Sequence, residues 1–384
     1  MNISLSHRLK KLPPYLFSEL GYLKEEIQKQ GKDVIDLGVG DPDLPTPEPI
    51  VKQLCVQARK KENQFYSSPR GLFELRQAIS EWYRKRFNIF LDPETEVLPL
   101  IGSKEGIAHL PLAFLNPQDL TLVPDPAYPP YRTGTILAGG IPYSLPLLRE
   151  NRFLPALNKI RKEIAQRAKI LFLNYPNNPT SAFAPADFLK EVVEFAKRYE
   201  IIVCYDNAYS EIYFDNLRPG SFLEIKGAKD VGVEFHSLSK TYNMSGWRIG
   251  WVCGNREVIE ALAKVKSNID SGLFLAIQRA GIVALSLENK KEREVYKRRR
   301  DVMLEGLRSL GFEVEEAKAT FYLWVHLPKN FTSSLEFSQK LLKEQGVMVT
   351  PGVGFGEYGE GYFRVALTVS ESRLKEAIER IRLF

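Results

Sequence analysis

Apolar runs of strand length recur through the middle of the chain, and segments with helical periodicity separate them. The runs are residues 96–102, 120–125, 169–175, 201–207, 232–239 and 248–254. One separating segment, residues 185–200, repeats its apolar residues at the spacing of a helix face, namely Phe188, Leu189, Val192, Val193 and Ala196. Continuous apolar strands between amphipathic helices are typical of a mostly parallel sheet with both faces covered. The pattern predicts an open α/β sheet, whose ligands bind at the carboxyl ends of its strands.

The C-terminal part has a different order of elements. A long charged helix is expected over about 290–310, followed by strands, a helix near 333–346, and further strand-like and helical segments. This order predicts an α+β unit that begins near residue 285. The first forty residues, with a strand expected at 34–40, are too few for a domain of their own. We therefore predict a large domain over 46–284 and a small domain formed by 1–45 with 285–384.

Composition and charge exclude several classes of protein. Lys and Arg number 53 against 47 Asp and Glu, and this small excess indicates neither nucleic acid nor a membrane as partner. The chain has no apolar run long enough to span a bilayer. The basic run at 297–300 is interleaved with acidic residues, which favours a solvated helix face.

The cysteines and histidines give no metal-site spacing. Cys55, Cys204 and Cys253 form no C-x-x-C pair, and the four histidines are scattered. We expect reduced thiols in a cytoplasmic protein and no metal site.

Titratable residues are expected at the buried ends of two strands. Asp206 follows four apolar residues, and a buried carboxylate needs a cationic or hydrogen-bonding partner. Lys240 follows the run at 232–239. A lysine there is costly unless it is paired, lowered in pKa or covalently bound, and a desolvated lysine suits Schiff-base chemistry. Taken alone, Asp206 is better explained by a helix cap or a structural salt bridge, and Lys240 could equally belong to an ordinary surface loop.

Candidate phosphate ligands and an amide-rich loop accompany these two residues. Ser237, Ser239 and Arg248 surround Lys240 in the sequence, and an arginine offers two parallel hydrogen bonds to an oxyanion. A Gly-Ser turn at 102–103 opens a helix whose N–H groups would face an anion, and NYPNNPT at 174–180 presents amides. Together these features match the requirements of pyridoxal phosphate, with an imine at Lys240 and a protonated ring nitrogen at Asp206.

The motifs SLSKTYNMSGWRIGW at 237–251 and NYPNNPT at 174–180 resemble those of the fold-type I, class I/II pyridoxal-phosphate aminotransferases. The resemblance extends over nearly the whole chain. It implies a large α/β domain, with a mostly parallel mixed sheet sandwiched by helices, and a smaller α+β domain. It also implies a homodimer with shared active sites.

The resemblance assigns a role to individual residues. Lys240, Asp206 and Tyr209 are implied as catalytic: Lys240 binds the cofactor and moves the proton, Asp206 pairs with the ring nitrogen, and Tyr209 hydrogen-bonds the phenolic oxygen together with Asn178. The other implied cofactor ligands are Tyr128 on the ring, Ser103, Lys104, Ser237, Ser239 and Arg248 around the phosphate, and Tyr66 at the neighbouring subunit's phosphate. Arg364 is expected to bind the substrate α-carboxylate, with Gly40 closing over it.

Within the family, three segments are most similar to LL-diaminopimelate aminotransferases: 13–20, 36–47 and 267–278. This likeness implies ping-pong transfer between LL-diaminopimelate and 2-oxoglutarate in lysine biosynthesis. Tyr15, Asn268 and Ser271 are then candidates for the substrate's distal end. Asn268 and Ser271 are equally well explained as caps at a helix start.

Other functions stay open at this point. They are aspartate, alanine, aromatic or N-succinyldiaminopimelate aminotransferases, and a carbon–sulfur lyase of the same fold. A regulator that keeps the fold is a further alternative. The intact Lys240, and a chain that begins almost at the aminotransferase body, favour an enzyme.

Overall fold

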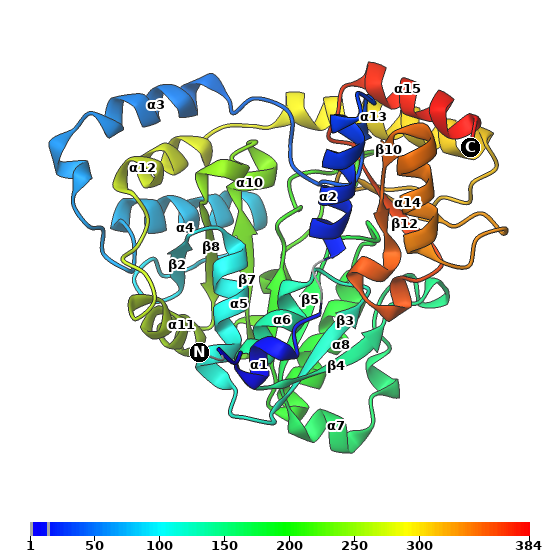
Figure 1. The fold of residues 1–384 in the computed structure, drawn as a ribbon. Helices are drawn as coiled ribbons and strands as arrows, with labels where there is room; N and C mark the ends of the chain where they lie inside the picture. Colours follow the sequence, from blue (N-terminus) through cyan, green and yellow to red (C-terminus); the bar gives the residue numbers. More distant parts are fainter. Residues whose placement is uncertain (1–2, 14–15) are drawn as a thin grey trace.

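A large central sheet has the strand order β2-β8-β7-β6-β5-β3-β4 in the computed structural model, which describes residues 3–13 and 16–384 (Figure 1). Its strands are β2 (Val97–Leu100), β3 (Leu120–Asp125), β4 (Ile141–Pro146), β5 (Ala168–Asn174), β6 (Ile202–Asp206), β7 (Gly232–Ser237) and β8 (Gly250–Gly254). Strand β8 is antiparallel to both of its neighbours, and the other pairs are parallel. The predicted mostly parallel mixed sheet is confirmed.

Helices cover both faces of this sheet (Figure 1). They include α3 (Glu48–Ala58), α4 (Phe73–Phe87), α5 (Ser103–Phe114), α6 (Pro130–Leu137), α7 (Lys162–Arg167), α8 (Ala186–Tyr199), α9 (Ala228–Val231), α10 (Leu238–Thr241), α11 (Arg256–Ser267) and α12 (Leu275–Ala284). Along β5, Leu171 and Leu173 belong to one apolar cluster, while Ile170 and Phe172 belong to another. The strand is therefore buried on both faces, which explains its unbroken apolar sequence.

The C-terminal elements form a smaller α+β unit. They are α13 (Lys290–Ser309), β9 (Tyr322–His326), α14 (Ser334–Gln345), β10 (Val347–Met348), β11 (Thr350–Pro351), β12 (Tyr362–Ala366) and α15 (Glu371–Arg382). From the N-terminal part, which begins with α1 (His7–Lys10), α2 (Leu16–Lys29) contacts α14, and β1 (Ile35–Asp36) pairs with β10. Segments from the two ends of the chain thus lie side by side (Figure 1). The domain limits at 46 and 284 stay predictions.

Two expectations from the sequence are wrong in detail. The strand expected at 34–40 is limited to Ile35–Asp36, and the residues after it form a loop beside the cavity described below. In the basic run, Arg299 and Arg300 are buried, at 5% and 2% exposure, and are not part of a solvated face. Arg299 donates to both carboxylate oxygens of Asp43, so this part of α13 fastens the loop that follows β1.

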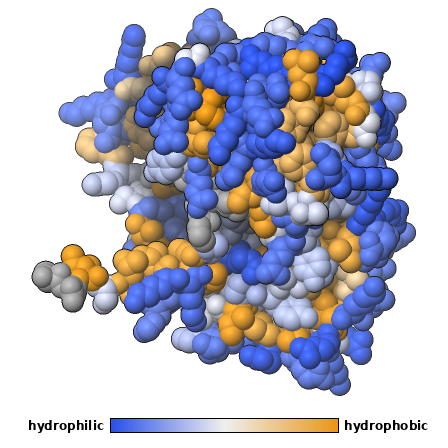
Figure 2. Space-filling model, turned by 45° about the vertical axis from the view of Figure 1, so that its right-hand side comes forward, coloured by the Kyte–Doolittle hydropathy of each residue, from blue (hydrophilic) through white to orange (hydrophobic). Residues whose placement is uncertain are grey.

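Hydrophilic residues cover most of the face drawn in Figure 2, and apolar residues interrupt them in separate groups. Within residues 3–13 and 16–384, no helix is long and apolar enough to cross a membrane.

Candidate active site

A cavity of about 660 Å³ lies at the carboxyl edge of the central sheet, between the strand ends and the smaller unit. It brings together most of the site residues predicted from the sequence: Gly40, Ser103, Lys104, Tyr128, Asn178, Asp206, Tyr209, Ser237, Ser239, Lys240, Arg248 and Arg364. The edge collects them because β2, β5, β6 and β7 run in one direction and all end there. Arg364 comes from β12 of the smaller unit.

Lys240 lies on α10, a single helical turn directly after β7. Ser237 caps this turn, since its Oγ accepts a hydrogen bond from the N–H of Ser239 at 3.1 Å. The Lys240 Nζ donates to the carbonyl oxygen of Gly40 at 3.0 Å. Burial lowers the pKa of Lys240 to about 8, although the charge of Asp41 opposes this shift. A neutral, nucleophilic amine is therefore far easier to reach here than on an exposed lysine.

Asp206 is the last residue of β6, and its carboxylate is buried at the cavity wall. The Tyr131 hydroxyl donates to Oδ2 at 2.8 Å, and the N–H of Ala208 donates a longer hydrogen bond to Oδ1 at 3.3 Å. Burial raises the pKa of Asp206 to about 6, and the hydrogen bond from Tyr131 opposes this shift. A cation beside Oδ1 would stabilise the ionised carboxylate, because it would replace the lost hydration.

Arg364 is held in place by polar and aromatic contacts. Its Nη1 donates to Asn178 Oδ1 at 2.7 Å, and its Nη2 donates to the carbonyl oxygen of Gly38 at 2.7 Å. The guanidinium carbon lies 4.1 Å from the ring centroid of Tyr322 and 4.8 Å from that of Phe355. The buried Nε has no partner among the described residues. Such a fixed guanidinium in a cavity wall is suited to bind a carboxylate.

The helix α5 begins at the cavity with Ser103 and Lys104. Its N-cap is Gly102 at φ 74°, which provides no side-chain cap, so the first N–H groups stay available for an anion. A Cβ at Gly102 would overlap the guanidinium of Arg248. The absence of that atom lets Arg248 approach the helix start, and the two together make a positive cradle.

Asp41, Tyr322 and Phe355 are among the cavity-lining residues that the sequence did not predict as site residues. The Tyr322 hydroxyl lies 3.0 Å from the hydroxyl of Tyr209. A Cβ at Gly40 would overlap the Tyr322 side chain, so only a glycine lets the backbone at position 40 lie this close to the tyrosine. Tyr131, which donates to Asp206 from outside the cavity, follows the predicted Tyr128 by three residues, and this repeat in residues 125–131 could have indicated it. No local pattern indicates Tyr322.

The remaining predicted residues lie elsewhere. Tyr66 is 91% exposed, and neither it nor Asn268 and Ser271 line the cavity within the described chain. Asn268 Nδ2 donates to the carbonyl oxygen of Lys264 at 2.8 Å, so this residue caps the end of α11. The alternative of a cap at a helix start is wrong for Asn268, because the segment follows a helix. Tyr15 is outside the described residues.

A family model decides the relationship. The model for aminotransferase class I and II matches residues 32–381. The chain belongs to this family. This aminotransferase is 56% identical to the LL-diaminopimelate aminotransferase of Aquifex aeolicus and 52% identical to that of Moorella thermoacetica, each over 98% of this chain and at least 97% of the relative.

Solved structures give the same family relationship. The substrate-bound BacF structure from Bacillus subtilis superimposes on the aminotransferase with a TM-score of 0.95 at 37% identity, covering 100% of this chain and 98% of that one. A probable N-succinyldiaminopimelate aminotransferase from Thermus thermophilus gives a TM-score of 0.90 at 35% identity, covering 96% and 99%. The chain is therefore a transaminase.

Metal ligands are not gathered anywhere in the ranges 3–13 and 16–384: no group of His, Cys, Asp and Glu there could hold a metal ion.

Proposed function

We propose that the protein is a pyridoxal-phosphate-dependent LL-diaminopimelate aminotransferase, which transfers the amino group to 2-oxoglutarate by a ping-pong mechanism. The observation that carries the cofactor is the desolvated Lys240 amine in one cavity with Asp206 and an anion cradle. The substrate is supported by the full-length identity of 50–56% to relatives that carry this name.

The chemistry of the cavity wall fits this cofactor. The Lys240 amine would hold the aldehyde, Asp206 would lie at the ring nitrogen, and Tyr128 would cover the ring. The first N–H groups of α5, with Ser237, Ser239 and Arg248, would hold the phosphate. Tyr209 and Asn178 would bind the phenolic oxygen. When bound, pyridoxal phosphate supplies an aldehyde and an electron-withdrawing ring.

The residues of the chain have separate tasks in the proposed reaction. Arg364 binds the α-carboxylate, and the hydrogen bonds from Arg364 to Asn178 and Gly38 fix its plane. Lys240, with a pKa lowered to about 8, accepts and returns the proton at the substrate Cα. Asp206 holds a negative charge inside the protein. The amino donor and the oxo acid occupy the same cavity in turn, so one carboxylate receptor serves both.

A homodimer is part of the proposal. Tyr66 is 91% exposed. The loop that carries it is bound to α12, since Gln278 Nε2 donates to Ser67 Oγ at 2.9 Å. We propose that Tyr66 reaches the phosphate site of a second copy, and that Asn268, Ser271 and Tyr15 contribute to recognition of the substrate's distal end. The cytoplasmic location stays a prediction.

The visible absorption spectrum tests the function. The purified protein is saturated with pyridoxal phosphate, and LL-diaminopimelate is added without an oxo acid. We expect the band of the bound cofactor to change to that of its amino form, and 2-oxoglutarate to restore it. Lys240→Ala is the control for covalent attachment.

The outcomes separate the parts of the proposal. A bound cofactor whose spectrum LL-diaminopimelate leaves unchanged would reject the substrate, and aspartate, alanine, aromatic amino acids and N-succinyldiaminopimelate would be tested next. Formation of pyruvate and ammonia from a sulfur amino acid would favour the lyase. The same spectrum for wild type and Lys240→Ala would reject the cofactor site.

A further inference from the structure

Asp206 and Tyr131 form a buried phenol–carboxylate pair behind the cavity wall. Tyr131 is 1% exposed, and its hydroxyl donates to Asp206 Oδ2 at 2.8 Å. It lies on α6, and Asp206 lies at the end of β6. The bond thus joins a helix to the carboxylate that the proposed function requires.

The Tyr131 ring has little freedom to move. It is stacked on Phe172, with centroids 5.2 Å apart and planes at 15°, and it meets the edge of Tyr128 at 5.8 Å. Tyr128 is itself a cavity residue. One side chain therefore supports both the carboxylate and an aromatic wall of the site.

We propose that Tyr131 is a positioning residue, which holds Asp206 by Oδ2 and leaves Oδ1 to pair with the ring nitrogen of the cofactor. This inference rests on the function proposed above. A donor to Oδ2 also favours the ionised form of the carboxyl, because the phenol stabilises the negative charge. Tyr131 would act on the bound ring through Asp206, without touching it.

Other charged and titratable groups act on Asp206 as well. They are Cys204 and Tyr205 on its own strand, Tyr209 in the segment that follows this strand, His236 on β7 and Lys240 on α10. The charges of His236 and Lys240 lower the pKa of Asp206. Removal of the Tyr131 hydroxyl leaves all of these groups in place, so a change in titration reports the hydrogen bond.

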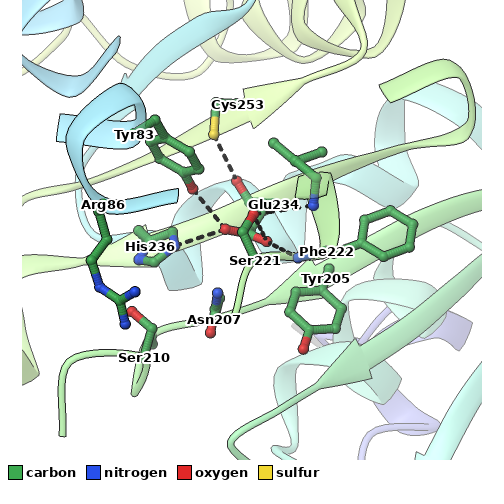
Figure 3. A network of polar contacts seen from close by, with 12 residues as sticks. Tyr83, Arg86, Tyr205, Asn207, Ser210, Ser221, Phe222, Glu234, His236 and Cys253 are labelled. Atoms are coloured by element: carbon green, nitrogen blue, oxygen red, sulfur yellow. Dashed lines mark hydrogen bonds and ion pairs between the residues drawn. The ribbon is translucent and has the colours of Figure 1, made fainter. Parts of the chain in front are cut away.

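The chain offers a matched control in Tyr83. Its hydroxyl also donates to a buried carboxylate, Glu234 Oε1, at 2.8 Å, and Tyr83 is fully buried (Figure 3). This second pair lies outside the cavity. Tyr83→Phe removes the same kind of bond as Tyr131→Phe, so an effect seen in only one variant cannot come from the loss of a buried hydroxyl in general.

The first test uses the protein without cofactor. The Asp206 carboxyl is titrated by isotope-edited NMR, and its signal is assigned by its loss in Asp206→Asn. We expect Tyr131→Phe to raise the pKa of Asp206 by about one unit, a tenfold change in its acid dissociation constant. We expect Tyr83→Phe to leave it unchanged. An Asp206 pKa that is equal in wild type and Tyr131→Phe would overturn the inference.

The second test uses the cofactor-loaded protein. In Tyr131→Phe, we expect the pH at which the bound-cofactor spectrum changes to shift, and kcat to fall about tenfold, with KM for the amino acid nearly constant. An equal fall in kcat in both tyrosine variants would indicate a merely structural role and overturn the inference.

A second substitution applies if Tyr131→Phe does not fold. A fluorotyrosine at 131 is expected to lower the pKa of Asp206, because its phenol is a stronger donor, and an unchanged pKa would count against the inference. Failure of wild type to bind pyridoxal phosphate would reject the proposed function, while the cofactor-free titration still decides whether Tyr131 governs Asp206.

Discussion

Asp206 and Glu234 are buried carboxylates on neighbouring strands, but their surroundings differ. Glu234 is paired with Tyr205 in the register of β6 and β7, so its side chain lies on the sheet face opposite to Asp206. Glu234 accepts hydrogen bonds from Tyr83 and from His236 Nε2, at 2.8 and 2.9 Å, and from Ser221 Oγ and the N–H of Phe222, at 2.8 and 2.7 Å (Figure 3). Within the described residues, the Asp206 carboxylate accepts one short hydrogen bond, from Tyr131 at 2.8 Å, and a longer one from the N–H of Ala208 at 3.3 Å.

The titration of the two carboxyls follows from this difference. Burial acts to raise the pKa of both residues. In Glu234, the hydrogen bond and charge of His236, with the other donors, outweigh burial and hold the pKa below its usual value. In Asp206 the donors are too few, and the pKa rises to about 6. A carboxylate satisfied by the protein supports the fold, whereas one left short of partners can receive a ligand.

Two buried lysines repeat the contrast. Lys266 is fully buried, and its Nζ lies 2.8 Å from both oxygens of Asp270 and 3.3 Å from both oxygens of Glu105. Lys240 donates to one carbonyl oxygen, and no carboxylate lies within ion-pair distance of its Nζ in the described chain. Lys266 fastens α11 to the start of α5, while Lys240 stays reactive.

Substitution of the two buried lysines should have the largest effects, on activity for Lys240 and on stability for Lys266. Lys240→Ala should lower transaminase activity by about 10⁴-fold or more, because it removes both the attachment group and the proton carrier. Without cofactor, its melting temperature should not fall, since a desolvated cation is removed. Lys266→Met should instead destabilise the fold by about 3 kcal/mol, because it leaves two carboxylates without their cation. Steady-state rates and thermal unfolding of both variants measure this. A Lys240→Ala enzyme with full activity would refute the contrast.

Glu234→Gln tests the satisfied carboxylate. The amide has an NH2 group in place of one of the two carboxylate oxygens, and each of these oxygens now accepts two hydrogen bonds. One pair of donors would therefore lose its acceptor, and His236 would lose its anionic partner. We expect a loss of about 3 kcal/mol in the free energy of unfolding, measured by denaturant titration. The kcat/KM of the folded protein should stay within about twofold of wild type. A large fall in kcat with unchanged stability would mean that this network belongs to the active site.

The sequence predicts a site residue when the signal for that residue lies in its own segment of the chain. Asp206, Lys240 and Arg248 each follow or precede an apolar strand, so the rule for strand ends was enough to bring them to one cavity. Tyr322 comes from β9 of the other unit, and its contact with Tyr209 depends on how the two units pack. No local pattern records such packing.

The fold shows the same limit. The residues of α8 that the 3.6-residue period places on one face are all buried. The charge pattern misled for 297–300, because neighbouring acidic residues look the same in the sequence whether an arginine is exposed or pairs with a carboxylate far away in the chain. Arg299 pairs with Asp43 and Arg300 with Asp215, and only the tertiary structure specifies these partners.

The smallest effect is the pH dependence that Asp206 gives to the protein without cofactor. The pKa of Asp206 is about 6 in the folded state and 3.8 in the reference state, so the folded protein binds the proton more tightly. Stability should therefore fall as the pH rises through this window, and the loss should stay constant above it. Asp206→Asn removes the ionisable group, so it should exceed wild type in stability by up to about 3 kcal/mol at pH 7 and match it in strong acid. Denaturant titrations of the two proteins across this pH range measure the difference.

Glu234→Gln should show the opposite sign, because the folded state lowers the pKa of Glu234. The variant should be less stable than wild type at neutral pH and closer to wild type in acid. If Asp206→Asn were also the weaker protein at pH 7, Asp206 would be as well satisfied as Glu234, and the distinction between a receptive and a satisfied carboxylate would fail.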